Sequence, residues 1–141
     1  MIVADACVTA KLFLNEPLSD VADKLVRRNS PVFMPEIALV EVSSAITRAY
    51  RNKIITKAEA EEKLEQWRRF AALDTVRLTP NADLLPDAEE FSLTFRYPVA
   101  DCLYLAAAKK YDLRLITTDQ PFIDAVKARF SNIHHLSSQA A

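Results

Sequence analysis

Short apolar segments alternate along this chain with longer segments in which apolar residues recur at helical spacing. The short segments are the expected strands, at Ile2–Asp5, Pro31–Pro35, Thr75–Leu78, Arg114–Thr117 and Ile133–Leu136. The expected helices are Val8–Leu14, Ser19–Arg28, Ile37–Arg51, Thr56–Phe70, Asp83–Ser92, Pro98–Tyr111 and Pro121–Phe130. Strands that are separated by helices usually pair in parallel, and the helices cover both faces of their sheet. The pattern therefore predicts an α/β fold with a mainly parallel central sheet.

The length of the chain, 141 residues, suits one domain with a single core. The sequence has no linker, repeat or low-complexity stretch, so the expected domain spans residues 1–141. No apolar run approaches the roughly 20 residues that cross a bilayer. The amino terminus also lacks the basic and apolar segments of a secretory signal. We therefore expect a cytoplasmic protein with no membrane partner.

The sequence contains no glycine, which excludes a glycine-rich phosphate loop and the usual dinucleotide-binding fingerprint. Helices must also end without the residue that most readily adopts the left-handed conformation. Asparagine and aspartate tolerate that conformation next best. We expect it at several of the four such residues that follow expected helices, which are Asn29, Asn52, Asp112 and Asn132.

Four acidic residues lie beside or inside apolar runs, where a carboxylate is unfavourable. They are Asp5, Glu41, Asp101 and Asp119. Taking a carboxylate out of water is costly unless the group is paired, hydrogen-bonded or bound to a cation. One hard divalent cation shared by all four is the simplest explanation for so many of them in one small domain.

The expected elements place these acids near one another. Asp5 and Asp119 end strands at the carboxyl edge, where open α/β sheets bind their ligands. Asp101 lies in the first turn of an expected helix, and Glu41 in the first or second turn of another. Each acid also has an ordinary explanation, as a helix N-cap, as a partner of a helix dipole or as an exposed helix position. The pattern by itself leaves both explanations open.

The four acids fall in motifs that together resemble the PIN domain, and within it the VapC-type toxins of prokaryotic toxin–antitoxin pairs. In chain order the motifs are Val3–Val8, Pro35–Val42, Asp101–Ala106 and Thr117–Phe122. Cys7 stands where the family usually has serine or another small polar residue, and glycines common in the family are absent. The resemblance covers essentially the whole chain and implies a PIN-like three-layer α/β/α domain.

The resemblance also implies an activity, that of a metal-dependent endoribonuclease serving as the toxin of a VapBC-type pair. Asp5, Glu41, Asp101 and Asp119 are the implied catalytic and metal-binding residues, with Mg²⁺ or Mn²⁺ as cofactor. Asp5 and Asp101 are expected to be direct ligands, and the other two to complete the site or hold water at the metal. The implied partners are an RNA substrate, a VapB-type antitoxin that fills the acidic groove, and a second copy of the chain in a homodimer.

Three cations are candidates for contacts with substrate phosphates, and they are Lys11, Arg48 and Arg51. Arg48 lies two helical turns beyond Glu41 on a similar face, although a solvated helix end is the ordinary alternative for each cation. The expected helix Thr56–Phe70 alternates acidic and basic residues, which is typical of a solvated surface. Two aromatic residues on this charged helix, Trp67 and Phe70, are expected at an interface.

The formal net charge of −1 does not decide whether the chain binds nucleic acid, because a local basic patch is sufficient for that. Two alternatives to a ribonuclease are a nuclease of the same fold that cleaves DNA and a non-catalytic module that binds RNA or protein. A binding module has no need of four costly carboxylates, and this favours an enzyme.

Overall fold

The computed structural model describes residues 1–140, and within them lies one five-stranded sheet in which every pairing is parallel. The strands are β1 (Ile2–Ala4), β2 (Val32–Pro35), β3 (Val76–Thr79), β4 (Leu115–Thr117) and β5 (Ile133–His135). Their order across the sheet is β3-β2-β1-β4-β5. The predicted α/β fold with a parallel central sheet is confirmed.

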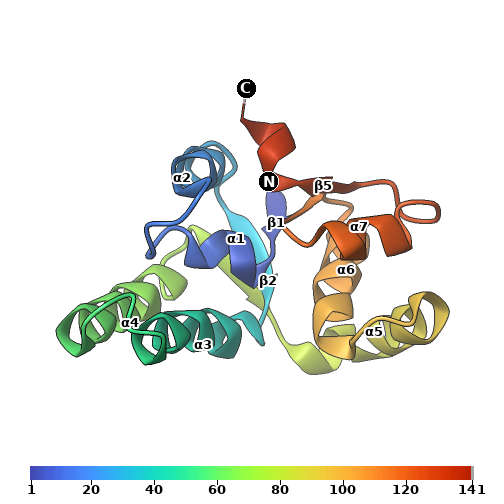
Figure 1. Cartoon of the computed structure of the whole chain (residues 1–141). Helices are drawn as coiled ribbons and strands as arrows, with labels where there is room; N and C mark the ends of the chain where they lie inside the picture. The colour runs from blue at the N-terminus through green and yellow to red at the C-terminus, as the bar shows by residue number, and fades with distance from the viewer. Residues whose placement is uncertain (141) are drawn as a thin grey trace.

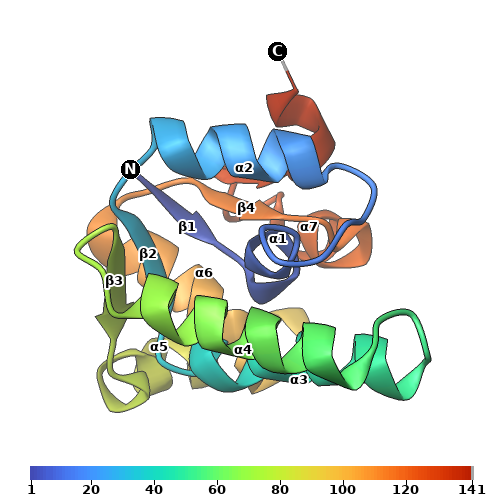
Figure 2. The same ribbon diagram turned by 90° about the vertical axis from the view of Figure 1, so that its left-hand side faces the viewer.

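Helices cover both faces of this sheet. They are α1 (Ala6–Ala10), α2 (Ser19–Arg28), α3 (Ala38–Arg51), α4 (Lys57–Ala71), α5 (Asn81–Phe95), α6 (Val99–Tyr111) and α7 (Gln120–Val126), with a 3₁₀ turn at Leu136–Gln139. In Figure 1, α1, α3 and α4 lie on one side of the sheet and α5 and α6 on the other. Figure 2 shows α3 and α4 side by side, as their contacts require. Among residues 1–140, no helix is both long and apolar enough to cross a membrane.

The core lies around the central strands β1 and β4. Ile2, Val3 and Ala4 make up β1, and all three are 0% exposed. Both faces of the strand are apolar because helices cover both faces, as is usual for a parallel sheet. Helix α6 contacts β1, β2 and β4, and its residues Cys102–Ala108 are buried throughout. Thr117 at the end of β4 is the one polar residue in the two strands.

Three helices differ from their expected bounds by more than one residue. Helix α1 begins directly after β1 and ends at Ala10, where the sequence pattern predicted a helix from Val8 to Leu14. Helix α5 extends to Phe95, because Phe95 packs against Phe91 with ring centroids 6.0 Å apart. Helix α7 ends at Val126, which is its last buried residue and is followed by three exposed ones.

The left-handed residues of this glycine-free chain are mostly not those expected. Within residues 1–140 the positive φ angles belong to Leu18, Lys53, Arg96 and Asp112. Asp112 confirms the expectation, whereas Asn29 has φ −120° and Asn52 has φ −86°. Asn132 is likewise outside the positive-φ set. At the first of these sites the reason is local, because the Asn29 side chain donates to the carbonyl oxygen of Leu25 at 2.9 Å without needing a left-handed backbone.

The aromatic residues of α4 correct a second expectation. Trp67 is 1% exposed and belongs to the core, so its predicted place at an interface is wrong. Its indole Nε1 donates to the carbonyl oxygen of Leu39 at 3.2 Å. Phe13 packs edge-on against both Trp67 and Phe70, with centroid distances of 5.8 Å. The charged residues of α4 therefore surround an aromatic face that is already covered.

Lys53 offers a test of backbone strain, because it follows α3 with φ 60° and an exposed side chain. A left-handed backbone costs a non-glycine residue roughly 1–2 kcal/mol, and the greater unfolded-state freedom of glycine offsets part of the gain. We expect Lys53→Gly to raise the free energy of unfolding by about 0.5–1 kcal/mol in urea denaturation. Asn52→Gly is the matched control and should not stabilise. Equal stabilities of the two variants would contradict the strain argument.

Candidate active site

The candidate site lies between β1 and β4, where the direction in which successive strands are added to the sheet changes. From β1 the chain moves outward to β2 and β3, and it then returns to place β4 on the other side of β1. Asp5 follows β1 directly, and Asp119 follows β4 by two residues. The carboxyl edge beside such a switch point is where open α/β sheets bind ligands. The topology thus brings together two acids from opposite ends of the sequence.

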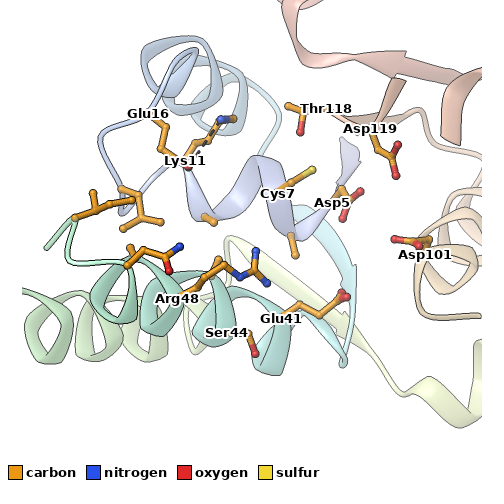
Figure 3. Close-up of a pocket in the computed structure, with 17 residues that line it drawn as sticks. Asp5, Cys7, Lys11, Glu16, Glu41, Ser44, Arg48, Asp101, Thr118 and Asp119 are labelled. Atoms are coloured by element: carbon orange, nitrogen blue, oxygen red, sulfur yellow. Dashed lines mark ion pairs between the residues drawn. The ribbon is translucent and has the colours of Figure 1, made fainter. Parts of the chain in front are cut away.

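Two helices bring the other acids to the same place. Glu41 lies in the first turn of α3 and Asp101 in the first turn of α6. Together with Asp5 and Asp119 they form the acidic cluster, whose members all line one pocket of about 750 Å³. Figure 3 shows their side chains around one end of that pocket. The convergence expected from the sequence is therefore present in the structure.

Asp5 is the most enclosed member of the acidic cluster, with 8% of its surface exposed. The Thr117 hydroxyl donates to Asp5 Oδ2 at 2.8 Å. The same hydroxyl oxygen accepts from the backbone N–H of Asp119 at 3.1 Å, so that Thr117 links two of the acids. Burial raises the pKa of the Asp5 carboxyl, and the hydrogen bond from Thr117 lowers it by a smaller amount.

Glu41 and Asp119 are each held by a tyrosine hydroxyl. Tyr104 donates to Glu41 Oε1 at 2.7 Å, and Tyr97 donates to the two carboxylate oxygens of Asp119 at 3.2 and 3.1 Å. Asp119 Oδ1 also accepts from the backbone N–H of Phe122 at 3.1 Å, so Asp119 caps α7 as well. Burial raises the pKa of Glu41, although the hydrogen bond from Tyr104 opposes that shift.

Asp101 differs from the other three acids. Within residues 1–140 its carboxylate has neither a hydrogen-bond partner nor an ion-pair partner. Burial is the largest reason that the pKa of Asp101 is raised to about 6, and repulsion from Asp5, Glu41 and Asp119 adds to it. An unpaired carboxylate among three others is the arrangement that a cation would stabilise.

The donor set fits a hard divalent cation, because carboxylate oxygens are the ligands that Mg²⁺ and Mn²⁺ prefer. Among the described residues, no three acidic, histidine or cysteine side chains are arranged so that they could hold a metal ion together. Three protein ligands are not required for this class of site, since Mg²⁺ usually binds through one or two carboxylates and keeps several waters. Asp5 and Asp101 are the members best suited to that role, because one is fixed by Thr117 and the other is unpaired.

The same pocket also carries basic side chains. Lys11 and Arg48 both line it, and Lys11 Nζ forms an ion pair with Glu16 Oε1 at 3.8 Å (Figure 3). Arg51, the third predicted phosphate contact, is exposed on α3 and is not among the lining residues. The structure therefore brings two of the three cations to the pocket that holds the acidic cluster.

Sequence reasoning missed three residues that contact the acidic cluster, namely Tyr97, Tyr104 and Thr117. Helical spacing contains a signal for Tyr104, which lies three residues after Asp101 and so on a neighbouring part of the same face. Thr117 lies in a recognised motif, but its bond to Asp5 spans 112 residues of sequence. No local pattern indicates that Tyr97 reaches Asp119.

Comparisons with known proteins agree with this fold. Residues 2–128 match the family described as PIN domain. Ribonuclease VapC3 of Pyrobaculum aerophilum is 28% identical over 128 residues, which cover 90% of this chain and 95% of that protein. A toxin–antitoxin complex from Klebsiella pneumoniae has a TM-score of 0.68 at 17% identity, covering 96% of this chain and 98% of that one. The sarcin–ricin-loop-cleaving toxin VapC20 of Mycobacterium tuberculosis has a TM-score of 0.67 at 20% identity, covering 89% and 95%.

The raised pKa values give a pH dependence that can be measured on the metal-free protein. Asp5, Glu41 and Asp101 bind protons more tightly in the folded state than in the unfolded state. When the pH rises from about 4 to about 7, these carboxyls lose their protons in the unfolded state first. The free energy of unfolding therefore falls over this range. We expect Asp101→Asn to be more stable than the parent by about 1–2 kcal/mol at pH 7 in EDTA, after allowance for solvent screening.

The gain from Asp101→Asn should disappear at pH values below about 4, where both states are protonated. Urea denaturation at the two pH values measures it. Asp124→Asn is the control, because Asp124 is exposed and its hydrogen bond from Gln120 lowers its pKa. That variant should not be stabilised at pH 7. An Asp101→Asn protein no more stable than the parent at pH 7 would contradict a pKa of Asp101 raised by burial and repulsion.

Proposed function

The chain belongs to the PIN domain family, and on this basis we propose that it is a Mg²⁺- or Mn²⁺-dependent endoribonuclease. The observation that carries the proposal is the position of Asp101. Its unpaired carboxylate faces the other members of the acidic cluster in an open pocket, and its pKa is raised to about 6. The name of the similar archaeal protein, Ribonuclease VapC3, supports RNA as the substrate.

The residues of the acidic cluster have two different roles in phosphodiester hydrolysis. A divalent ion supplies hydroxide at neutral pH and neutralises charge on the phosphodiester when it is bound. Asp5 and Asp101 would hold that ion. Glu41 and Asp119 orient the attacking water by accepting its hydrogen bonds, and their own positions are fixed by Tyr104 and Tyr97.

The basic side chains of the pocket would hold the RNA backbone. Lys11 and Arg48 line the same pocket as the acidic cluster, so one strand can pass from the cations to the carboxylates. Arg51 lies about one turn of helix further along α3 than Arg48 and does not line the pocket, so we assign it no contact with the strand. Binding by phosphate contacts alone carries no base preference.

We further propose that the chain is the toxin of a VapBC-type pair in the cytoplasm and forms a homodimer. The similar structure from Klebsiella pneumoniae is a toxin–antitoxin complex. The acidic cluster suits an antitoxin peptide with a basic side chain, because an ion pair with these carboxylates would block the metal. Asp101 is the natural partner for that side chain, since it has none among residues 1–140.

The activity is tested with Asp101→Asn in a cleavage assay on single-stranded RNA with Mn²⁺. We expect the rate to fall by at least about 100-fold, because a proposed metal ligand is lost while the fold is retained. Asp124→Asn, an exposed substitution on α7, should cleave at the parental rate.

Other outcomes of the same assay favour the alternatives. Cleavage of flap DNA in preference to RNA would indicate a DNA nuclease, and RNA binding without cleavage would indicate a non-catalytic module. An Asp101→Asn protein as active as its parent would refute the proposed mechanism.

The phosphate contact is tested with Arg48→Gln. Loss of one charge-assisted contact should raise KM for RNA by about 5–10-fold with little change in kcat. The variant should also show a weaker dependence of binding on salt, since one counterion fewer is released. Arg51→Gln is the matched control on the same helix, and its KM should change by less than about 2-fold. If kcat rather than KM changes in Arg48→Gln, Arg48 has a role in the chemical step.

A further inference from the structure

Two tyrosine hydroxyls contact the acidic cluster, and both come from one short segment of the chain. Tyr97 lies in the connection between α5 and α6, and Tyr104 lies on α6 itself. Asp101 lies between them in sequence. Residues 97–104 therefore supply one member of the acidic cluster and a hydrogen-bond donor to each of two others, Glu41 and Asp119.

Tyr97 is fixed through its ring and through its backbone. Its ring packs against the buried ring of Phe122, with centroids 4.7 Å apart. Its backbone carbonyl accepts from the Ser92 hydroxyl at 2.5 Å, and the next residue is Pro98, whose ring restricts the backbone. The Tyr97 hydroxyl is thus held against both oxygens of Asp119 by packing that Asp119 does not itself provide.

Tyr104 is fixed by burial instead. Its side chain is 0% exposed, within the run of buried residues on α6. Its hydroxyl donates a hydrogen bond to Glu41 Oε1 at 2.7 Å, the shortest of the three tyrosine–carboxylate distances. A buried hydroxyl without an acceptor is unfavourable, so the pair constrains the Glu41 side chain to one position at the edge of the pocket.

The two tyrosines restrict the positions of Asp119 and Glu41 in the pocket. Asp119 is also bound by the Phe122 N–H, which together with Tyr97 leaves it little freedom to rotate. Glu41 projects from α3 toward Asp5 and Asp101 (Figure 3). Without such ties, mutual repulsion would drive these side chains apart in the metal-free protein.

We propose that Tyr97 and Tyr104 are positioning residues that hold Asp119 and Glu41 in the pocket beside Asp101, where a divalent ion would bind. The inference rests on the proposed metal-dependent function, and it adds that residues 97–104 supply or hold three of the four acids, whereas Thr117 holds Asp5. Hydrogen-bonding partners of metal-site carboxylates typically change metal affinity or activity by about 10–100-fold when they are removed.

Tyr111 provides a matched control on the same helix. Its hydroxyl is 2.8 Å from Thr79 Oγ1, a tyrosine hydrogen bond of similar length that lies outside the pocket. Tyr111→Phe removes the same atom as Tyr97→Phe and Tyr104→Phe. Weaker Mn²⁺ binding in all three variants would reflect general destabilisation. Weaker Mn²⁺ binding in Tyr97→Phe and Tyr104→Phe alone would reflect an effect on the site.

The experiment measures Mn²⁺ binding to the full chain by the electron paramagnetic resonance signal of free Mn²⁺. We expect Tyr97→Phe and Tyr104→Phe each to raise the dissociation constant about 10-fold, and Tyr111→Phe to change it less than about 2-fold. In the double variant Tyr97→Phe/Asp119→Asn, the tyrosine substitution should add less than about 2-fold, because its partner is already altered. Tyr97 is partly exposed, so its variant keeps the test decisive even if Tyr104→Phe fails to fold.

The outcomes separate this inference from the proposed function. A parent that neither binds Mn²⁺ nor cleaves RNA would overturn both. A parent that binds Mn²⁺ and cleaves RNA, with Tyr97→Phe and Tyr104→Phe no different from Tyr111→Phe, would overturn only the positioning role. Tighter Mn²⁺ binding in Tyr97→Phe would also overturn it, because the hydroxyl would then compete with the metal for Asp119.

Discussion

Repulsion among the four carboxylates of the acidic cluster is the constraint on which the rest of the structure depends. Burial and proximity raise the pKa of Asp5, Glu41 and Asp101, so charging all of them in one pocket is unfavourable. The fold offsets part of this cost with hydrogen bonds from Thr117, Tyr104 and Tyr97. The amino-terminal turns of α3 and α6, where Glu41 and Asp101 lie, add favourable helix dipoles. Asp101 alone lacks a hydrogen-bond donor among the described residues. A cation bound there would offset the remaining cost of charging the four carboxylates.

The parallel sheet makes this arrangement possible. Its switch point places β4 beside β1, and the register pairs Ala4 with Ile116. The next residue on each strand, Asp5 and Thr117, can therefore meet across the sheet edge. Helices α3 and α6 approach this edge from the two sides of the sheet, and each brings an acid in its first turn. Tyr104 on α6 and Tyr97 just before it then hold two further members of the cluster, Glu41 and Asp119.

The strands and the four acids could be predicted because both depend on local chemistry. Apolar runs bounded by polar residues indicate buried strands, and a carboxylate inside such a run is conspicuous wherever it falls. Left-handed residues were harder to predict, and Leu18, Lys53 and Arg96 adopt that conformation without the side chains that favour it. Trp67 was placed at an interface because its helix is charged, but its neighbours Phe13 and Phe70 lie on a face that the sequence alone does not show to be covered.

The sequence by itself determined the parallel α/β architecture, the motifs and the identity of the four acids, because hydrophobic periodicity and misplaced charge are properties of short segments. Only the tertiary structure decided which side chains meet the acids. The contacts of Thr117 with Asp5, of Tyr104 with Glu41 and of Tyr97 with Asp119 join residues 112, 63 and 22 positions apart. Their formation depends on strand order and helix packing. It was this long-range packing that distinguished the unpaired Asp101 from its three hydrogen-bonded neighbours.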